Sequence, residues 1–248
     1  MAELPYPRTV SFTSTYNFRD VGGYTGLEGR KTRWRRLFRA DALHRLDGTD
    51  WETYAALGVR TVIDLRREFE IEKYGRIRAY DGLSYHNLVL RHVDWDEVPH
   101  PDGTVHERWL ADRYLNFAED GREALREALS LIADPAAAPV VVHCMAGKDR
   151  TGTTLALALS LLGVSDDDIA EDYALTTTSM RGLVEYLRVN NPEAVEGNEH
   201  MFDSPEEAIR LFLHDLRELH GSVENYVREI GLTDKQVAAM RDHLLTEA

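Results

Sequence analysis

Most of what this sequence predicts follows from one stretch, Val140-Val141-Val142-His143-Cys144-Met145-Ala146-Gly147-Lys148-Asp149-Arg150-Thr151-Gly152. Its three consecutive valines favour a short buried strand. The residues from Thr151 to Leu162 are apolar almost all round, which is typical of a helix packed under a sheet. The residues from His143 to Gly152 are therefore expected to leave the carboxyl end of a strand and enter a helix.

Such a loop is a binding site for a phosphate-sized anion, because successive backbone N–H groups and the positive end of the helix point into one concavity. The same field stabilises a thiolate. We therefore expect Cys144 to be a nucleophile. The expected phosphate-binding residues are Met145, Ala146, Gly147, Lys148, Asp149, Arg150 and Thr151.

The other side chains of the loop fit this chemistry. Arg150, six positions after Cys144, offers a planar fork to two phosphoryl oxygens, a geometry that lysine does not reproduce. The two glycines of the loop suit tight turns and close helix packing. The Thr151 hydroxyl is expected to hydrogen-bond the sulfur. His143 is expected to hold the loop from beneath, with general base catalysis as the alternative.

Other interpretations of the stretch are weaker. A lone cysteine is usually a small buried apolar residue, but Cys-x5-Arg-Thr-Gly between a strand and an apolar helix is a much narrower pattern. A Walker A loop would need a glycine at Val142 and a Ser or Thr at Asp149, and a thioredoxin-like site would need a second cysteine. The ten histidines show no metal-ligand spacing. We therefore predict no metal and no other cofactor.

The composition is that of a soluble globular protein. The chain has 248 residues, of which 43% are hydrophobic, and 29 Lys and Arg against 43 Asp and Glu give it a formal charge of −14. This acidic balance argues against nucleic acid as a partner, and any phosphate binding must be concentrated in a local pocket. The single cysteine, Cys144, excludes an intrachain disulfide and favours a reducing compartment.

No stretch of the chain predicts export or stable membrane insertion. The first ten residues lack the apolar core of a secretory signal. The longest apolar run, Leu155 to Val164, falls well below the roughly 20 residues that span a bilayer. We therefore expect a cytoplasmic protein, and the sequence does not indicate its oligomeric state.

Strands that alternate with helices predict an α/β fold, with a mostly parallel central sheet flanked by helices and a helical C-terminal half. Thr49-x-x-Glu52 has the spacing of a capping box and should open a short helix that ends at Gly58, before a buried strand over Val59–Leu65. Further helices are expected over Glu107–Asp120, Glu123–Ala133 and most of the chain after Ser165. Without a repeat or linker, residues 1–248 are expected to form one domain.

Two segments are candidates for completing or covering the site. Asp94 to Gly103 is too irregular for a helix or strand and too apolar for a spacer, so it is a candidate active-site loop. The helical region 165–221 is long enough to include a lid, and ordinary helix packing is the alternative. The apolar underside of such a lid would be formed by Met180, Leu183, Leu187 and Phe202.

The loop resembles that of the cysteine-based protein tyrosine phosphatase superfamily, specifically its bacterial branch with the motif His-Cys-x-x-Gly-Lys-Asp-Arg-Thr-Gly, the mycobacterial PtpB-like tyrosine and lipid phosphatases. Other blocks are similar to the family's and occur in the same order, at residues 17–24, 38–43, 64–66 with Glu70, 171–176 and 221–226. Together they span most of the chain. Ala40 departs from the family, which commonly has a serine there.

The resemblance implies a metal-independent phosphatase that hydrolyses phosphomonoesters through a phosphocysteine intermediate. The implied substrates are phosphotyrosine proteins, and often phosphoserine, phosphothreonine or phosphoinositides. Lys148 would add attraction for a multiply charged lipid head group, or it would only neutralise Asp149. A phosphate-binding pseudophosphatase is the rival function, but such proteins usually lose the nucleophile or the arginine, and Cys144 and Arg150 are both present.

A phosphatase of this kind needs a carboxylic acid that protonates the leaving group, and no Trp-Pro-Asp tripeptide occurs here. Asp64 ends a predicted strand, and the carboxyl ends of parallel strands converge, which would put Asp64 near Cys144. The resemblance points to the same aspartate. The alternative is a structural pair with Arg66. Asp149, between two cations, should be held ionised, which suits loop ordering better than proton donation. Further candidates are Asp94 and Asp96.

Overall fold

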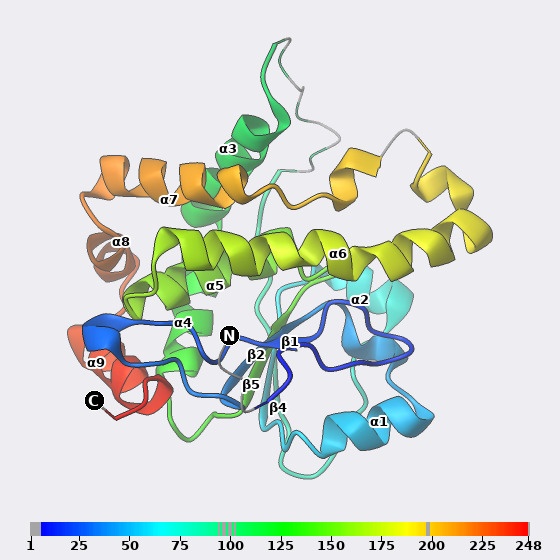
Figure 1. Ribbon diagram of the computed structural model, residues 1–248, viewed down its shortest axis with the longest axis horizontal. Coiled ribbons are helices and arrows are strands. Elements are labelled where there is room, and N and C mark those ends of the chain that lie inside the picture. The colour runs from blue at the N-terminus through cyan, green and yellow to red at the C-terminus, as the bar shows by residue number, and fades with distance from the viewer. Residues whose placement is uncertain are drawn as a thin grey trace.

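A computed structural model describes residues 6–93, 95, 98, 101, 103–196 and 199–247. These residues form a five-stranded sheet in the order β1-β2-β5-β3-β4. β1 is antiparallel to β2, and the other neighbours are parallel. Helices cover the sheet, and α6 crosses in front of it in Figure 1. The structure therefore confirms the predicted α/β class and the mostly parallel sheet.

The strand that precedes the Cys144 loop, which we call the phosphate loop, lies at the centre of the sheet. The strands are β1 (Arg19–Asp20), β2 (Leu37–Ala40), β3 (Thr61–Asp64), β4 (Ser84–Asn87) and β5 (Val140–His143). In the register of the sheet, Ala40 and Asp64 both lie opposite His143. The carboxyl ends of β2, β3 and β5 therefore meet at one edge, where the loop after β5 begins.

The central strands alternate between two hydrophobic cores, as period-2 side-chain geometry requires. Val140 and Val142 belong to the larger core, and Val141 belongs to the smaller one. The larger core packs against α3 (His106–Asp120), α4 (Arg122–Ala133), α5 (Asp149–Leu161), α6 (Asp166–Asn190), α7 (Glu206–His220), α8 (Val223–Glu229) and α9 (Asp234–Leu244). The smaller core lies on the other face beside α1 (Gly48–Ala55).

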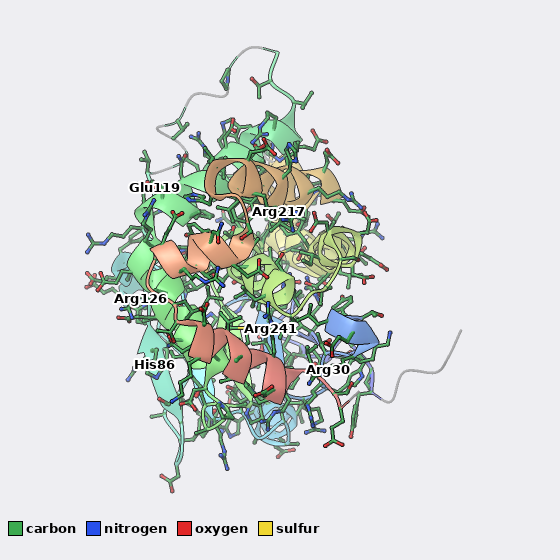
Figure 2. The ribbon with its side chains drawn as sticks, turned by 90° about the vertical axis from the view of Figure 1, so that its left-hand side faces the viewer. Arg30, His86, Glu119, Arg126, Arg217 and Arg241 are labelled. Atoms are coloured by element: carbon green, nitrogen blue, oxygen red, sulfur yellow. The ribbon has the colours of Figure 1, made fainter. Side chains whose placement is uncertain are left out.

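The C-terminal half is helical, as predicted, and its last helices are tied to α5. Figure 2 looks onto this side of the molecule, where Arg241 lies between α8 and α9. Its Nε donates to the Leu161 carbonyl at 2.7 Å, and its guanidinium pairs with Glu224 of α8. None of the described helices has both the length and the apolarity that a membrane crossing requires.

Two predicted helix starts are wrong by one or two residues. α1 begins at Gly48, and its N-cap is Asp47, whose side chain accepts the Gly48 N–H; the Thr49 capping box does not form. α5 begins at Asp149 instead of Thr151. Asp149 and Arg150 therefore project from the first turn of α5, where the positive end of the helix dipole lies.

Some expectations concern residues that the structure does not describe. These residues include 94, 96, 97, 99, 100 and 102. The candidate loop Asp94–Gly103 therefore stays a prediction, as do Asp94 and Asp96 as acids.

Candidate active site

The loop between β5 and α5 presents its backbone amides and has its carbonyl groups tied back. In the part of the chain that the structure describes, the N–H groups from Met145 to Arg150 have no hydrogen-bond acceptor. The carbonyl groups are bound from behind by Ala42 N to Met145 O (3.0 Å), Asn17 Nδ2 to Ala146 O (2.9 Å) and Arg39 Nη2 to Gly147 O (2.8 Å). Unpaired donors at a helix N-terminus form an anion cradle.

The turn of the loop requires glycine at position 147. Gly147 has a φ of +66°, in the left-handed region. A Cβ atom there would lie 2.3 Å from the carbonyl oxygen of Ala40. The loop therefore crosses directly over the end of β2, and no side chain fits between them.

Cys144 lies at the base of this cradle, and Arg150 is fixed beside it. The Cys144 residue is only 3% exposed. Glu70, in α2 (Glu68–Tyr74), holds the Arg150 guanidinium with both oxygens, at 2.6 and 3.0 Å. Nη1 also donates to the Leu65 carbonyl at 3.4 Å, which leaves Nε and one N–H of Nη2 for a phosphoryl group.

Electrostatics keep the Arg150–Glu70 pair ionised. Burial alone would lower the pKa of Arg150, but the charges of Cys144 and Glu70 outweigh it and raise that pKa. Burial would likewise raise the pKa of Glu70, but the hydrogen bonds and charge of Arg150 lower it. Arg150 is thus a pre-oriented cation beside Cys144, with a planar fork that suits a phosphoryl group.

A second buried charge cluster supports the loop from the side of α6. Asp172 accepts from Arg39 Nη1 at 2.6 Å and from Arg19 Nε at 3.2 Å, and all three residues are about 1% exposed. Because Arg39 also holds the Gly147 carbonyl, this cluster fixes the loop. Burial and the charge of Arg39 lower the pKa of Arg19 to about 10, as expected where two cations share one carboxylate.

Asp64 lies beneath the loop and is engaged on both oxygens. Arg66 Nε and Nη2 donate to it at 2.9 and 2.7 Å, and Tyr85 Oη donates at 2.8 Å. Burial opposes ionisation, but His143 and Arg66 lower the pKa of Asp64 to about 2. The Asp64 residue is 0% exposed. A buried, strongly ionised carboxylate does not fit a proton donor, and the geometry matches the structural alternative of a pair with Arg66.

His143 lies beneath the loop beside this pair. Its Nδ1 is 3.1 Å from the Cys144 carbonyl oxygen, to which it donates, and its Nε2 is 3.5 Å from Asp64 Oδ2. Burial lowers the pKa of His143. A fully enclosed imidazole in this position holds the backbone of Cys144.

Two loop side chains differ from the expectations drawn from sequence. The Thr151 hydroxyl is buried without a hydrogen-bond partner among the described residues, so the expected bond to the sulfur is not formed. Lys148 is 1% exposed, and its Nζ donates to the Met201 carbonyl at 2.9 Å. It lies 3.6 Å from Asp149 Oδ1, beyond hydrogen-bond distance.

Asp149 is less constrained than its two cationic neighbours suggested. Lys148 is engaged by Met201, and Arg150 is engaged by Glu70. The hydrogen bond that Asp149 does accept comes from Tyr114 of α3, at 2.7 Å. Its side chain is 22% exposed. Asp149 is thus a partly solvent-exposed carboxylate within the loop.

Sequence reasoning did not assign roles to Glu70, Asp172 or Tyr114. The first two lie in blocks that the family resemblance marks, so a signal existed, but it did not say what they touch. For Tyr114 we find no signal in the sequence beyond its place on a helix. Within the described residues, no three His, Cys, Asp or Glu side chains gather as metal ligands.

A parallel sheet with an anion cradle around a buried cysteine defines the class of cysteine-based phosphoric monoester hydrolases. The match to the model of the Tyrosine phosphatase family covers residues 10–246, and the chain belongs to that family. It is 29% identical to the triple specificity protein phosphatase PtpB of Mycobacterium tuberculosis, over 93% of this chain and 96% of that protein. It is 25% identical to a tyrosine-protein phosphatase of Nostoc commune, over 83% of this chain and 73% of the relative.

Proposed function

We propose that this tyrosine phosphatase acts through Cys144 as nucleophile and Arg150 as phosphate clamp, with Asp149 as the proton donor. The observation that carries the proposal is the loop itself. Its carbonyl groups are tied back and its amides from Met145 to Arg150 are unpaired around the thiol. This arrangement matches the charge of a transferring phosphoryl group and not that of a neutral ligand.

In the first step, the Cys144 thiolate attacks phosphorus, the S–P bond forms and the P–O bond to the leaving group breaks. The carboxylic acid gives its proton to the leaving oxygen. In the second step, a water molecule attacks the phosphocysteine and passes its proton to the carboxylate. The S–P bond breaks, and inorganic phosphate leaves with the thiolate restored. The loop amides and Arg150 stabilise the equatorial oxygens in both steps.

Two observations favour Asp149 over Asp64 as the acid, which reverses the assignment drawn from sequence. Asp64 is fully enclosed and paired with Arg66, so it cannot reach a leaving group without breaking that pair. Asp149 lies within the phosphate loop, is partly exposed and has Oδ2 without a partner among the described residues. A proton donor must come within hydrogen-bond distance of the leaving oxygen.

The substrate class follows from the family and includes phosphotyrosine. The relative named as a triple specificity phosphatase supports extension to phosphoserine, phosphothreonine or phosphoinositides. The Met201 carbonyl accepts a hydrogen bond from Lys148 in this structure. We propose that Lys148 also attracts a multiply charged head group. Lys148→Met should then lower the rate on phosphoinositides relative to a monoaryl phosphate.

A lid over the site fits this arrangement. Met201 belongs to the segment η5 (Glu199–Phe202), and the following Ser204 N–H donates to Thr177 of α6 at 2.8 Å. We propose that the lid lies within residues 165–221 and that residues 1–248 form one domain. Met180 is buried, while Leu183, Leu187 and Phe202 are half-buried. Hydrogen exchange with and without orthovanadate tests it, and equal protection of this segment in both states would remove the lid.

Turnover of a small aryl phosphate in the presence of a chelator tests the nucleophile. Cys144→Ser should abolish turnover but keep orthovanadate binding, because the amides and Arg150 survive the change. Residual activity above about one-thousandth of wild type contradicts the covalent mechanism. Strong inhibition by the chelator would point instead to a metallohydrolase.

Two substrates separate the candidate acids. On an aryl phosphate with a poor leaving group, Asp149→Asn should lose roughly 10²- to 10⁴-fold in rate, and it should lose much less on one with a good leaving group. Asp64→Asn should lower both rates by a similar factor, as a change in loop support does. If the two variants exchange these patterns, Asp64 is the donor.

A further inference from the structure

Two buried tyrosine hydroxyls form a chain that ends on Asp149. Tyr114 of α3 donates to Asp149 Oδ1 at 2.7 Å, and its hydroxyl is also hydrogen-bonded to that of Tyr173 of α6. The Tyr114 and Tyr173 residues are 0% and 1% exposed. Neither hydroxyl is needed to satisfy a helix end or a turn. The chain links α3 and α6 to the carboxylate that we assign as the acid.

The number of protons fixes the direction of this chain. A tyrosine hydroxyl has a single hydrogen. While Asp149 is ionised it only accepts, so Tyr114 gives its hydrogen to Oδ1 and must accept from Tyr173. Burial and the charge of Asp149 raise the pKa of both tyrosines above the ordinary value. Both hydroxyls therefore stay protonated over the working pH range and serve as permanent donors.

Packing allows these tyrosines a single position. The Tyr173 ring lies against Gly152 of α5, where a Cβ atom would be 2.9 Å from the ring. The Tyr114 ring packs edge-on against Phe212 of α7, with centroids 6.2 Å apart. The two phenol rings themselves meet at 75°. Their hydroxyls are thus held by the core and not by solvent, so the bond to Asp149 costs little reorganisation.

We propose that Tyr114, supported by Tyr173, is a positioning residue that ties down Oδ1 of Asp149 and leaves Oδ2 to exchange the catalytic proton. This inference rests on the assignment of Asp149 as the acid. With Oδ1 already accepting from Tyr114, the proton of the neutral acid sits on Oδ2. The same oxygen then takes the proton of the attacking water when the phosphocysteine is hydrolysed. One carboxylate thus performs both steps without changing rotamer.

The test compares Tyr114→Phe and Tyr173→Phe with a matched control, Tyr226→Phe. Tyr226 is also fully buried, and its hydroxyl donates to the Ala118 carbonyl of α3 at 2.7 Å, away from the phosphate loop. The measured quantities are the steady-state rate on the poor leaving group, the phosphocysteine hydrolysis rate after a burst with a good leaving group, and orthovanadate affinity. Thermal melting checks folding.

Tyr114→Phe should lower kcat on the poor leaving group by about tenfold to a hundredfold, the value of a hydrogen bond to a charged group. It should slow phosphocysteine hydrolysis and leave orthovanadate affinity within about twofold. Tyr173→Phe should move the same quantities in the same direction by less. Tyr226→Phe should change none of them.

A wild-type kcat on the poor leaving group in Tyr114→Phe, or a change matched by Tyr226→Phe, overturns the inference. If Tyr114→Phe does not fold, Tyr173→Phe decides in its place, and a wild-type kcat there overturns it. In an Asp149→Asn background, Tyr114→Phe should cause no further loss on the poor leaving group. A wild-type rate of Asp149→Asn itself would instead show that the proposed acid is wrong, whatever the tyrosine variants do.

Discussion

Replacing Asp172 by asparagine removes the one carboxylate that two buried arginines share. Asp172, Arg19 and Arg39 are each about 1% exposed, and the carboxylate accepts from the guanidinium groups at 3.2 and 2.6 Å. Asparagine keeps the shape but not the charge. Within the described part of the chain, both arginines then lose the carboxylate that pairs with them. Breaking a buried pair in this way costs about 3–5 kcal/mol, a large part of the roughly 5–15 kcal/mol that stabilises a domain.

Urea unfolding at pH 7 measures this loss, with Asp166→Asn as the control. Asp166 lies on the same helix and also binds an arginine with both oxygens, Arg217 at 2.6 and 2.7 Å, but its side chain is 38% exposed. An exposed pair contributes about 0–1 kcal/mol. The two variants thus have similar bonds and differ in burial. The m-value should stay constant, so that the midpoint reports stability.

The variant should also weaken orthovanadate binding, because Arg39 holds the Gly147 carbonyl as well as Asp172. The two arginines lower the pKa of Asp172 against the effect of burial. Its stabilising contribution is therefore complete above the unfolded-state value near 4 and constant between pH 5 and 8. A loss below about 1 kcal/mol, a loss equal to that of Asp166→Asn, or a gap that changes over this pH range refutes the reasoning.

Three further predictions concern the loop and its supports. Gly147 and Gly58 have the same φ of +66°, but an added Cβ atom would meet backbone atoms at Gly147 and nothing at Gly58. Gly147→Ala should therefore abolish orthovanadate binding in calorimetry, and Gly58→Ala should not. Glu70→Gln should raise the orthovanadate dissociation constant about tenfold or more, because Arg150 loses its bidentate partner; an unchanged constant contradicts the clamp. The free energy of unfolding of Asp64→Asn should be about 2–3 kcal/mol lower than that of wild type above pH 4, and this difference should disappear as the pH falls to about 2. A difference that persists at pH 2 in acid unfolding contradicts the pair of Asp64 with Arg66.

The elements next to the phosphate loop were predictable because their signals are local. The valines of β5, the apolar α5 and the helices on either side each carry their own periodicity. β1, β2 and β4 do not. β1 has two residues, β2 contains the buried Arg39, and β4 reads Ser-Tyr-His-Asn. A buried arginine in a strand is stable only because Asp172, far along the chain, neutralises it, and no local pattern encodes that.

The proposed change of the acid from Asp64 to Asp149 has the same origin. In the sequence, Asp149 stands between Lys148 and Arg150, and the neighbours of a residue are the only partners that a sequence offers. In the fold, both cations are engaged elsewhere, by Met201 and Glu70. Asp64 pairs with its near neighbour Arg66, the alternative that the sequence offered, and also accepts from Tyr85. Apart from that pair, the surroundings of the two aspartates depend on residues that lie far apart in the sequence, such as Glu70 and Arg150.

The structure also explains how a chain with a formal charge of −14 can hold a phosphoryl dianion. Surface cations would have to overcome the negative field of the whole molecule and would be screened by salt. Here the positive groups are buried directly under the loop. Among the described residues, Arg19 and Arg39 share one carboxylate, and the positive excess lies beside Gly147, within the run of free amides from Met145 to Arg150. Because interior charges are screened much less, attraction of the anion is confined to the cradle around Cys144.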